Sequence, residues 1–444
     1  MAEAVPGGIV RRIYGNLGRL LSGKAAAGLI SLAYMIVAAR ALGARDYGVL
    51  VLVHTFAITV GGIVEFPGWH AVVRYGAQWQ AKGDPLRLMR LLRFVASVEM
   101  TAGIAAVITA ACLAPQLGPG LGWSPTALAF ALPYSLAVLG SVRSTPAGYL
   151  QLMGRFDLLG YHNAVPALAR LIGAAIVWAC GFGLLGFLVA WLIAALLEWA
   201  VLWGMAIHVA RRTLRGVSLL GTVRGVRADN PGIWRFMLIA NADVTFGELA
   251  GRIAPLIVGW MLGPAAVGLY AIAQRATVVI AQPAQILGQA AFAELARLAA
   301  RHDHGARMRR AVLHCIGIAL AAAVPVVLLL VWFGRDVAIL IGGKGFADAA
   351  GVMLWLTLAR AIALAGPPCS AALIAMGRPS LSVGANLFAN LAPLPLLPWL
   401  LGRFGLISAG WHAVLQAAIA SLLMLWFVFR ESRGGSHGEV AAPA

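Results

Sequence analysis

Seven ionisable side chains lie inside long apolar segments, and most of them are of types that bind anions. They are Lys24, Arg170, Arg252, Arg275, Arg360, Asp243 and Glu248. A charge at the centre of a bilayer costs about 2.5–3.5 kcal/mol on insertion scales, so such groups usually face a water-filled cavity or a partner. Arginine forms paired hydrogen bonds with phosphate oxygens and stays charged at any cellular pH. The five basic residues therefore predict a cationic cavity for a ligand that carries phosphate.

The two acidic residues have a structural and a functional interpretation, and the sequence leaves both open. Glu248 and Arg252 are four residues apart, so on one helix they share a face and can form an ion pair that only supports packing. Alternatively, Asp243 or Glu248 binds a cation or a proton. Lys24 also has a second interpretation, because it lies near the end of its apolar segment and its ammonium can reach the membrane interface.

The rest of the chain is too apolar for a water-soluble protein. Of its 444 residues, 61% are hydrophobic and 11% are charged, and the mean hydropathy is +0.86. Soluble domains are about 45–50% apolar and about 25% charged. Apolar stretches near the ~20 residues that a membrane-crossing helix needs recur along the chain, without the alternation of a membrane barrel. We predict an all-α integral membrane protein with about 12 transmembrane helices, near 21–42, 47–68, 94–116, 124–146, 160–181, 184–208, 236–260, 266–290, 310–333, 348–374, 381–402 and 406–429.

The basic residues favour one side of the membrane. About 24 of the 34 lysines and arginines fall in the termini and in alternate loops, and about five fall in the loops between those. Excess Lys and Arg marks the cytoplasmic side, so both termini are predicted to be cytoplasmic. The net charge of +18 then reflects topology and attraction to anionic lipids. The scattered basic residues form no single stripe, so nucleic acid is not a predicted partner.

The second half of the chain repeats the first. Three pairs of segments match, namely VAARALGARDYGVL from Val37 with VGWMLGPAAVGLYAI from Val258, LQLMGRFDLLGYHN from Leu150 with LIAMGRPSLSVGAN from Leu373, and FGLLGFLVAW from Phe182 with FGLISAGWHA from Phe404. Their conserved positions are offset by 220, 223 and 222 residues, which predicts two parallel six-helix repeats related by an axis along the membrane normal. The predicted domains are an N-terminal lobe at 1–208, a cytoplasmic linker at 209–235, a C-terminal lobe at 236–430 and a cytoplasmic tail at 431–444.

Prolines interrupt many of the predicted spans. Each removes a backbone donor and bends its helix. The densest run is PLPLLPW at 393–399, with Pro393, Pro395 and Pro398. We predict that the span at 381–402 bends there.

The segments AARALGARDYGVLVL and LGPAAVGLYAIAQR and the two MGR loops resemble the polysaccharide-biosynthesis flippases. These are the Wzx-type members of the MOP superfamily, which also includes the lipid II flippases and the MATE multidrug exporters. The resemblance covers nearly the whole chain and implies a two-lobed, V-shaped bundle. It further implies transport of an undecaprenyl-pyrophosphate-linked oligosaccharide across a bacterial inner membrane by alternating access. The cationic cavity would hold the pyrophosphate, and Asp243 or Glu248 would couple a cation or proton to transport.

Two rival functions remain open. A cation-coupled drug exporter would require an acidic cavity, and basic residues outnumber acidic ones in the deep spans. A membrane-embedded glycan polymerase or ligase usually carries a large outward loop, whereas the longest outward loop predicted here is about 14 residues. The resemblance also makes glycosyltransferases or a polymerase candidate neighbours of the protein.

Other motifs do not predict further chemistry. GRLLSGKA from Gly18 lacks the Ser or Thr of a phosphate-binding loop and follows no strand. His302, Asp303 and His304 lie in a basic loop without a second ligand cluster. His54, alone on an apolar helix, is interpreted as hydrogen-bonded in the core, with a proton relay as the alternative. We predict no metal, no cofactor and no enzymatic activity.

Overall fold

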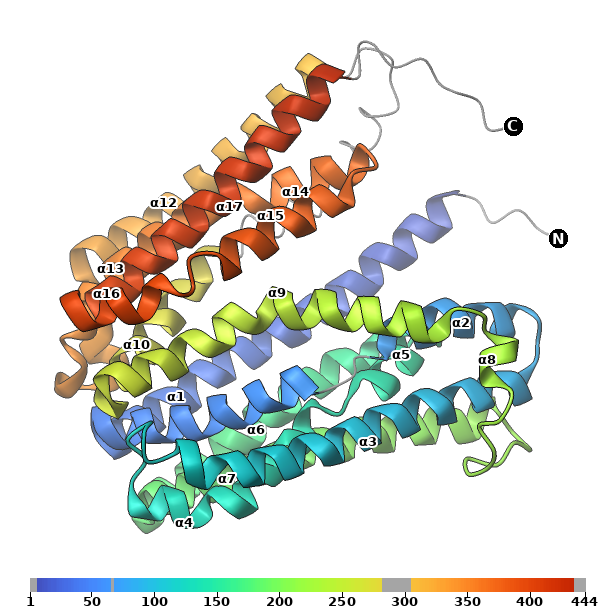
Figure 1. Cartoon of the computed structure of the whole chain (residues 1–444), viewed down its shortest axis with the longest axis horizontal. Helices are drawn as coiled ribbons and strands as arrows, with labels where there is room; N and C mark the ends of the chain where they lie inside the picture. Colours follow the sequence, from blue (N-terminus) through green and yellow to red (C-terminus); the bar gives the residue numbers. More distant parts are fainter. Residues whose placement is uncertain (1–5, 65–67, 282–304, 435–444) are drawn as a thin grey trace. The chain divides into compact units, whose positions relative to one another are not determined.

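The computed structural model describes residues 6–64, 68–281 and 305–434; within these ranges the side chains of 6–26, 64, 242–244, 246–248, 250 and 279 lie outside the described set. In this part of the chain every regular element is a helix (Figure 1). The first half contains α1 (Pro6–Val64), α2 (Trp69–Ala81), α3 (Pro85–Leu117), α4 (Pro125–Tyr134), η1 (Ser135–Ser141), α5 (Ser144–Leu152), α6 (Phe156–Cys180) and α7 (Gly183–Thr213). The second contains α8 (Val226–Asp229), α9 (Ile233–Leu262), α10 (Pro264–Thr277), η2 (Val278–Ala281), α12 (Gly305–Gly342), η3 (Lys344–Phe346), α13 (Ala349–Ala363), α14 (Gly366–Ala375), α15 (Pro379–Leu391), α16 (Leu396–Phe404) and α17 (Ile407–Gly434).

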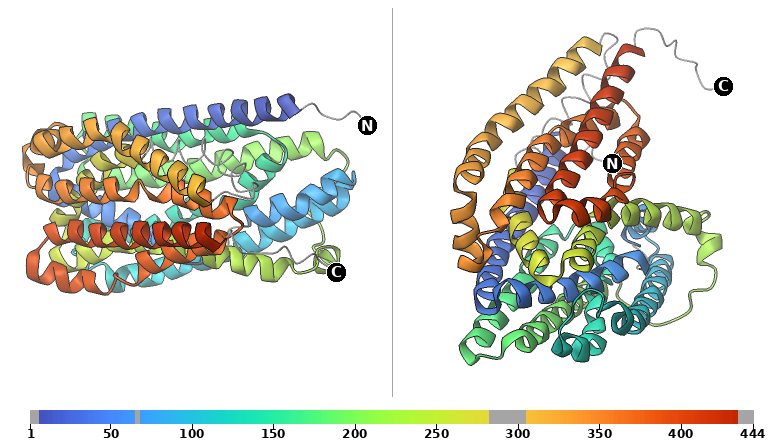
Figure 2. Two further views of the ribbon diagram at one scale, coloured as in Figure 1. Left: turned by 90° about the horizontal axis from the view of Figure 1, so that it is seen from above. Right: turned by 60° about the vertical axis from the view of Figure 1, so that its left-hand side comes forward.

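The chain forms two compact units. Unit 1 comprises Met1–Leu42 and Val49–Thr245, and unit 2 comprises Gly43–Gly48 and Phe246–Ala444. Helix α9 therefore begins in unit 1 and ends in unit 2. Within each unit the long helices run roughly alongside one another, as three directions of view show (Figures 1 and 2).

The helices have the length and composition of membrane spans. Eight segments in the described ranges are long and apolar enough to cross a bilayer, and the bent pair α15–α16 makes a ninth. The count is compatible with the predicted twelve, because α1 contains two of the predicted spans and the description of the span after α10 stops at Ala281. The all-α membrane fold is thus confirmed. The predicted bend is also found, since α15 and α16 meet at 41°.

Matching glycines end matching helices in the two repeats. Gly43 has φ 70° and ψ 176°, and Gly263, 220 residues later, has φ 80° and ψ 175°. This backbone region is open almost only to glycine, so both Leu-Gly turns break the helix in the same way. Gly154 (φ 68°) and Gly377 (φ 75°) likewise end α5 and α14 in the left-handed C-terminal turn that favours glycine.

Two further glycines permit a close backbone contact inside unit 2. The turn at 43–48 lies against the first turns of α10. A Cβ added at Gly48 would overlap the carbonyl of Pro264, and a Cβ added at Gly268 would overlap the carbonyl of Ala44. The contact is reciprocal, because both pairs of residues are related by the 220-residue offset. Glycine is needed at both positions because a backbone carbonyl in a helix cannot rotate away.

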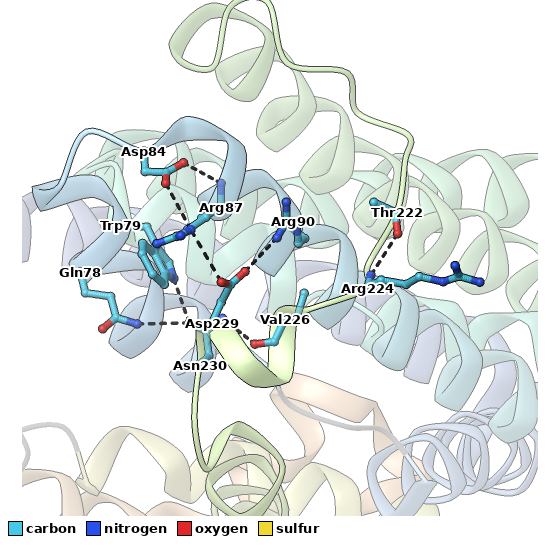
Figure 3. A network of polar contacts seen from close by, with 10 residues as sticks. All are labelled: Gln78, Trp79, Asp84, Arg87, Arg90, Thr222, Arg224, Val226, Asp229 and Asn230. Carbon is cyan, nitrogen blue, oxygen red and sulfur yellow. Dashed lines mark hydrogen bonds and ion pairs between the residues drawn. The ribbon is translucent and has the colours of Figure 1, made fainter.

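The segment between the repeats is bound to unit 1. Asn230 is only 1% exposed, and its side-chain oxygen accepts hydrogen bonds from Trp79 Nε1 at 2.8 Å and Gln78 Nε2 at 3.1 Å (Figure 3). The neighbouring carboxylate of Asp229 lies 2.9 Å from Arg90 Nη1 and 3.7 Å from Arg87 Nε. The beginning of α9 is consequently fixed to the ends of α2 and α3.

Substitution of either close-contact glycine should destabilise the protein. We expect Gly48→Ala and Gly268→Ala each to lower the free energy of unfolding by about 2 kcal/mol or more, because overpacking against rigid groups costs about 1–3 kcal/mol. The apparent Tm of the detergent-solubilised protein measures the change. Gly317→Ala is the control, because nothing lies within 4 Å of its added Cβ. Equal Tm values for all three variants would contradict the close contact.

Loss of the Asn230 amide should release the inter-repeat segment. Asn230→Ala leaves the buried Trp79 N–H without its acceptor, a cost of about 1–3 kcal/mol. We expect trypsin to cut after Arg224 or Arg227 at least about fivefold faster, the factor that corresponds to ~1 kcal/mol. Thr222→Ala is the control, because the Thr222 hydroxyl accepts only a local hydrogen bond from the Arg224 N–H among the contacts described for that side chain. Unchanged cleavage in Asn230→Ala would show that this network does not fix the segment.

Candidate functional site

A cation inside unit 1 is surrounded by neutral rings. Arg170, on α6, donates from Nη1 to the Tyr34 hydroxyl at 3.3 Å and from Nη2 to His54 Nε2 at 3.2 Å. Its guanidinium carbon lies 5.0 Å from the centre of the Trp191 ring, within the range of a cation–π interaction. These partners come from α1 and α7, so three helices that are distant in sequence position this one charge.

The contact with Arg170 fixes the state of His54. A guanidinium has donors but no acceptor, so His54 Nε2 must accept the hydrogen bond from Arg170. The ring proton therefore lies on Nδ1, which donates to the Tyr134 hydroxyl at 2.9 Å. His54 is a neutral imidazole held between an arginine and a tyrosine, in agreement with the predicted core hydrogen bond.

The charge of Arg170 lacks a contacting counter-ion within the described residues. Its Nε is buried and has no hydrogen-bond partner there. The acid whose charge acts on Arg170 is Glu198, and that carboxylate already accepts a hydrogen bond from Arg143. Arg170 thus combines a net positive charge with an unused N–H donor. Such a group can bind a phosphate or carboxylate oxygen through charge-assisted hydrogen bonds.

The other buried acid of unit 1 has a structural partner. Glu99, on α3, is fully buried and accepts hydrogen bonds from the backbone N–H groups of Ser144 and, at 2.7 Å, Thr145. These are the first residues of α5, where backbone N–H groups have no partner within the helix. Glu99 therefore caps α5 and does not balance Arg170.

Unit 2 contains a polar cavity of about 270 Å³. Arg360 of α13 lines it, and the other polar side chains of its lining are Tyr270, Gln274, Asn386, Asn390, His412 and Gln416. Sequence reasoning missed these neutral residues. The available signal was their spacing, because Tyr270 and Gln274, Asn386 and Asn390, and His412 and Gln416 are three pairs four residues apart, which places each pair on one helix face.

The remaining predicted residues are not brought into either group. Arg252 in α9 and Arg275 in α10 are partly buried in unit 2 and do not line its polar cavity. The side chains of Lys24, Asp243 and Glu248 lie outside the described set, so the proposed Glu248–Arg252 pair and the coupling role stay predictions. A cavity shared by all five basic residues also stays a prediction.

No metal-binding group is found in the described part of the chain. Within residues 6–64, 68–281 and 305–434, no three His, Cys, Asp or Glu side chains lie together in a way that could hold an ion. The run His302–His304 lies outside the described residues.

The fold is that of MOP-superfamily transporters. An inward-facing MATE multidrug transporter of this superfamily superposes with a TM-score of 0.69, at 16% identity over 94% of this chain and 96% of the other. A MATE in the straight conformation gives 0.61, at 17% identity over 96% of each chain. A MOP transporter from Pyrococcus furiosus, described as having a binding pocket of reverse polarity, gives 0.58, at 16% identity over 95% and 96%. The fold thus defines a multi-pass membrane protein of the MOP kind.

The sequence places the chain within one family of that superfamily. Residues 37–350 match the model of a family described as polysaccharide biosynthesis protein, and the chain belongs to this family. It is also 26% identical over 292 residues to the inner membrane protein YghQ of Escherichia coli K12, which covers 66% of this chain and 82% of the relative. The resemblance to the Wzx-type MOP proteins is thereby confirmed.

Removal of the Glu99 carboxylate should destabilise α5. Glu99→Ala leaves two buried N–H groups unpaired, each at a cost of about 1–3 kcal/mol. Glu99→Gln keeps one side-chain acceptor, so we expect a smaller loss. The apparent Tm in detergent should fall in the order wild type, Gln variant, Ala variant. Ser97→Ala serves as the control, since the Ser97 hydroxyl bonds a carbonyl of its own helix; a wild-type Tm for Glu99→Ala would refute the capping role.

Proposed function

We propose that this protein is a flippase, which moves an undecaprenyl-pyrophosphate-linked oligosaccharide across the bacterial inner membrane by alternating access. Membership of a polysaccharide biosynthesis family supports a glycan substrate. The MOP fold supports a transporter rather than an enzyme. The E. coli relative, named an inner membrane protein, supports the location.

Arg170 is the observation that carries this proposal. A lipid-linked sugar stops at the membrane because its anionic head group must leave water, and burial of an unpaired charge is very costly. Arg170 supplies a positive charge and an unused donor inside a transmembrane unit, without a contacting carboxylate among the described residues. A pyrophosphate oxygen that binds Arg170 would replace part of the lost hydration. Since arginine stays protonated at cellular pH, this site needs no proton to bind its ligand.

The wider site extends this reasoning to residues whose surroundings are less fully described. Lys24, Arg252, Arg275 and Arg360 would add positive charge along the path of the pyrophosphate. Asp243 or Glu248 would bind the coupling cation or proton. The lobes at 1–208 and 236–430 would alternate their access, with both termini in the cytoplasm. Glycosyltransferases would supply the substrate, and a polymerase would receive it.

A reconstituted flipping assay tests the proposal. Proteoliposomes receive a fluorescent undecaprenyl-pyrophosphate oligosaccharide, and an added quencher reports the fraction in each leaflet over time. We expect Arg170→Ala to slow flipping by at least about tenfold, because one charge-assisted hydrogen bond contributes about 1.5–3 kcal/mol and 1.4 kcal/mol is a factor of ten. Arg170→Lys should retain an intermediate rate, since lysine keeps the charge but loses the paired donors.

The control variant is Arg335→Ala, which removes an exposed arginine from α12. It should flip at the wild-type rate at equal reconstitution. Wild-type flipping by folded Arg170→Ala would refute the role of Arg170. Failure of the intact protein to flip any lipid-linked sugar, combined with export of a cationic drug, would replace the proposal by the drug-exporter function.

A further inference from the structure

The polar cavity of unit 2 has the size of a small-ligand site. Its volume of about 270 Å³ lies just below the ~300–1,000 Å³ typical of small-molecule pockets. At ~30 Å³ per molecule it would hold about nine waters, so its ligand is of the size of one ring with its substituents. The lining comes from α9, α10, α13, α15, α16 and α17, all within unit 2.

The polar groups around this cavity suit a neutral ligand rich in hydroxyl groups. Gln416 donates one N–H to the backbone oxygen of Asn390 at 2.9 Å, and Asn386 donates one to the backbone oxygen of Ser382 at 3.1 Å. These bonds fix the planes of both amides. Each amide still has a second N–H and a carbonyl oxygen with acceptor capacity. A hydroxyl group both donates and accepts, so it matches an amide on both counts.

The charges of the lining argue against a bound cation. No carboxylate is among the residues that line the cavity in the described ranges, and its one charged side chain is Arg360. His412 Nε2 contacts the backbone oxygen of Pro393 at 3.1 Å, so this ring nitrogen is engaged by the fold. One arginine among several neutral donors and acceptors is the composition expected for an uncharged polar ligand with a single strong anchor.

Comparison of the two repeats shows why unit 2 has this cavity. Along the 220 and 222 offsets, Tyr34 corresponds to Ala254 and Trp191 to Ala413. In unit 1 these two rings surround Arg170, whereas in unit 2 both alanines line the cavity. The space therefore arises where two large aromatic residues in one repeat are replaced by methyl groups in the other.

The same comparison shows that the polar lining is not a requirement of the fold. His412 and Gln416 correspond, along the 222 offset, to Ala190 and Ala194 of unit 1. A helix at this place in the repeat thus folds with small apolar residues. The polar residues of unit 2 have an origin other than helix packing, and ligand binding accounts for them.

We propose that this cavity binds one neutral sugar residue of the transported glycan. The proposal rests on the proposed function, because that function supplies the glycan. Asn386, Asn390 and Gln416 would bind ring hydroxyl groups, Arg360 would anchor one oxygen, and Tyr270 would cover an apolar face of the sugar. The site recognises the sugar, and it is distinct from Arg170, which has the chemistry to bind phosphate.

Saturation-transfer NMR on the full-length protein in detergent tests the sugar site without requiring transport. The probes are glucose, galactose and N-acetylglucosamine, each titrated alone. We expect saturable transfer to at least one of them. Ala413→Trp restores the residue that unit 1 carries and fills the cavity, and we expect it to weaken binding at least about tenfold, the effect of one lost strong contact. Leu415→Trp, at an exposed position two residues away, is the matched control and should bind as the wild type does.

A second variant guards against a misfolded Ala413→Trp. Asn390→Leu keeps the side-chain volume but removes the amide, and it should weaken sugar binding while the size-exclusion profile stays unchanged. No saturable signal from any of the three sugars, or equal affinities in wild type, Ala413→Trp and Asn390→Leu, would overturn the sugar site.

A pyrophosphate titration separates this result from the proposed function. Inorganic pyrophosphate, followed by phosphorus NMR, should bind Ala413→Trp as it binds the wild type and should bind Arg170→Ala more weakly. Loss of sugar binding alone would therefore concern the cavity. Intact sugar binding without flipping of any lipid-linked sugar would sink the flippase and leave the cavity as a sugar site.

Discussion

The interior of a bilayer offers no water, so each polar group within a span must find its partner inside the protein. This constraint explains most of the polar contacts in unit 1. Glu99 is satisfied by the open N-terminus of α5, and Glu198 by Arg143. Arg170 is satisfied only in part, by rings and by a neutral histidine. A positive charge held in this way remains able to bind an anion, which is why it is the centre of the proposed site.

Duplication gave the protein two versions of one six-helix unit, and the two versions have different chemistry. Unit 1 places an arginine among aromatic residues, a dense group with little free space. Unit 2 has alanines in place of two of those aromatic residues and amides around the resulting cavity. A lipid-linked oligosaccharide also has two chemically distinct parts near the membrane, an anionic diphosphate and a neutral sugar. The divergence of the repeats would give each part its own binding groups.

Much of the fold could be predicted because the bilayer imposes a simple code. Segment length and hydropathy indicate the spans, the Leu-Gly and MGR turns indicate the repeat, and the proline run indicates the bend between α15 and α16. The partners of Arg170 could not be predicted in the same way. Tyr34, His54 and Trp191 lie on different helices, and their contact depends on how each helix is rotated. In spans that are apolar on every face, hydropathy carries almost no information on rotation.

The reciprocal contact of the glycine turns bears on the origin of the chain. Gly48 faces the carbonyl of Pro264, and Gly268 faces the carbonyl of Ala44, its counterpart. When residue i meets j and the copy of j meets the copy of i, the interface has two-fold symmetry, as in a homodimer of identical subunits. The turn thus retains the geometry that a half-length ancestor would have used to pair with its own copy. Gene fusion would then have converted an association that depended on concentration into a permanent one.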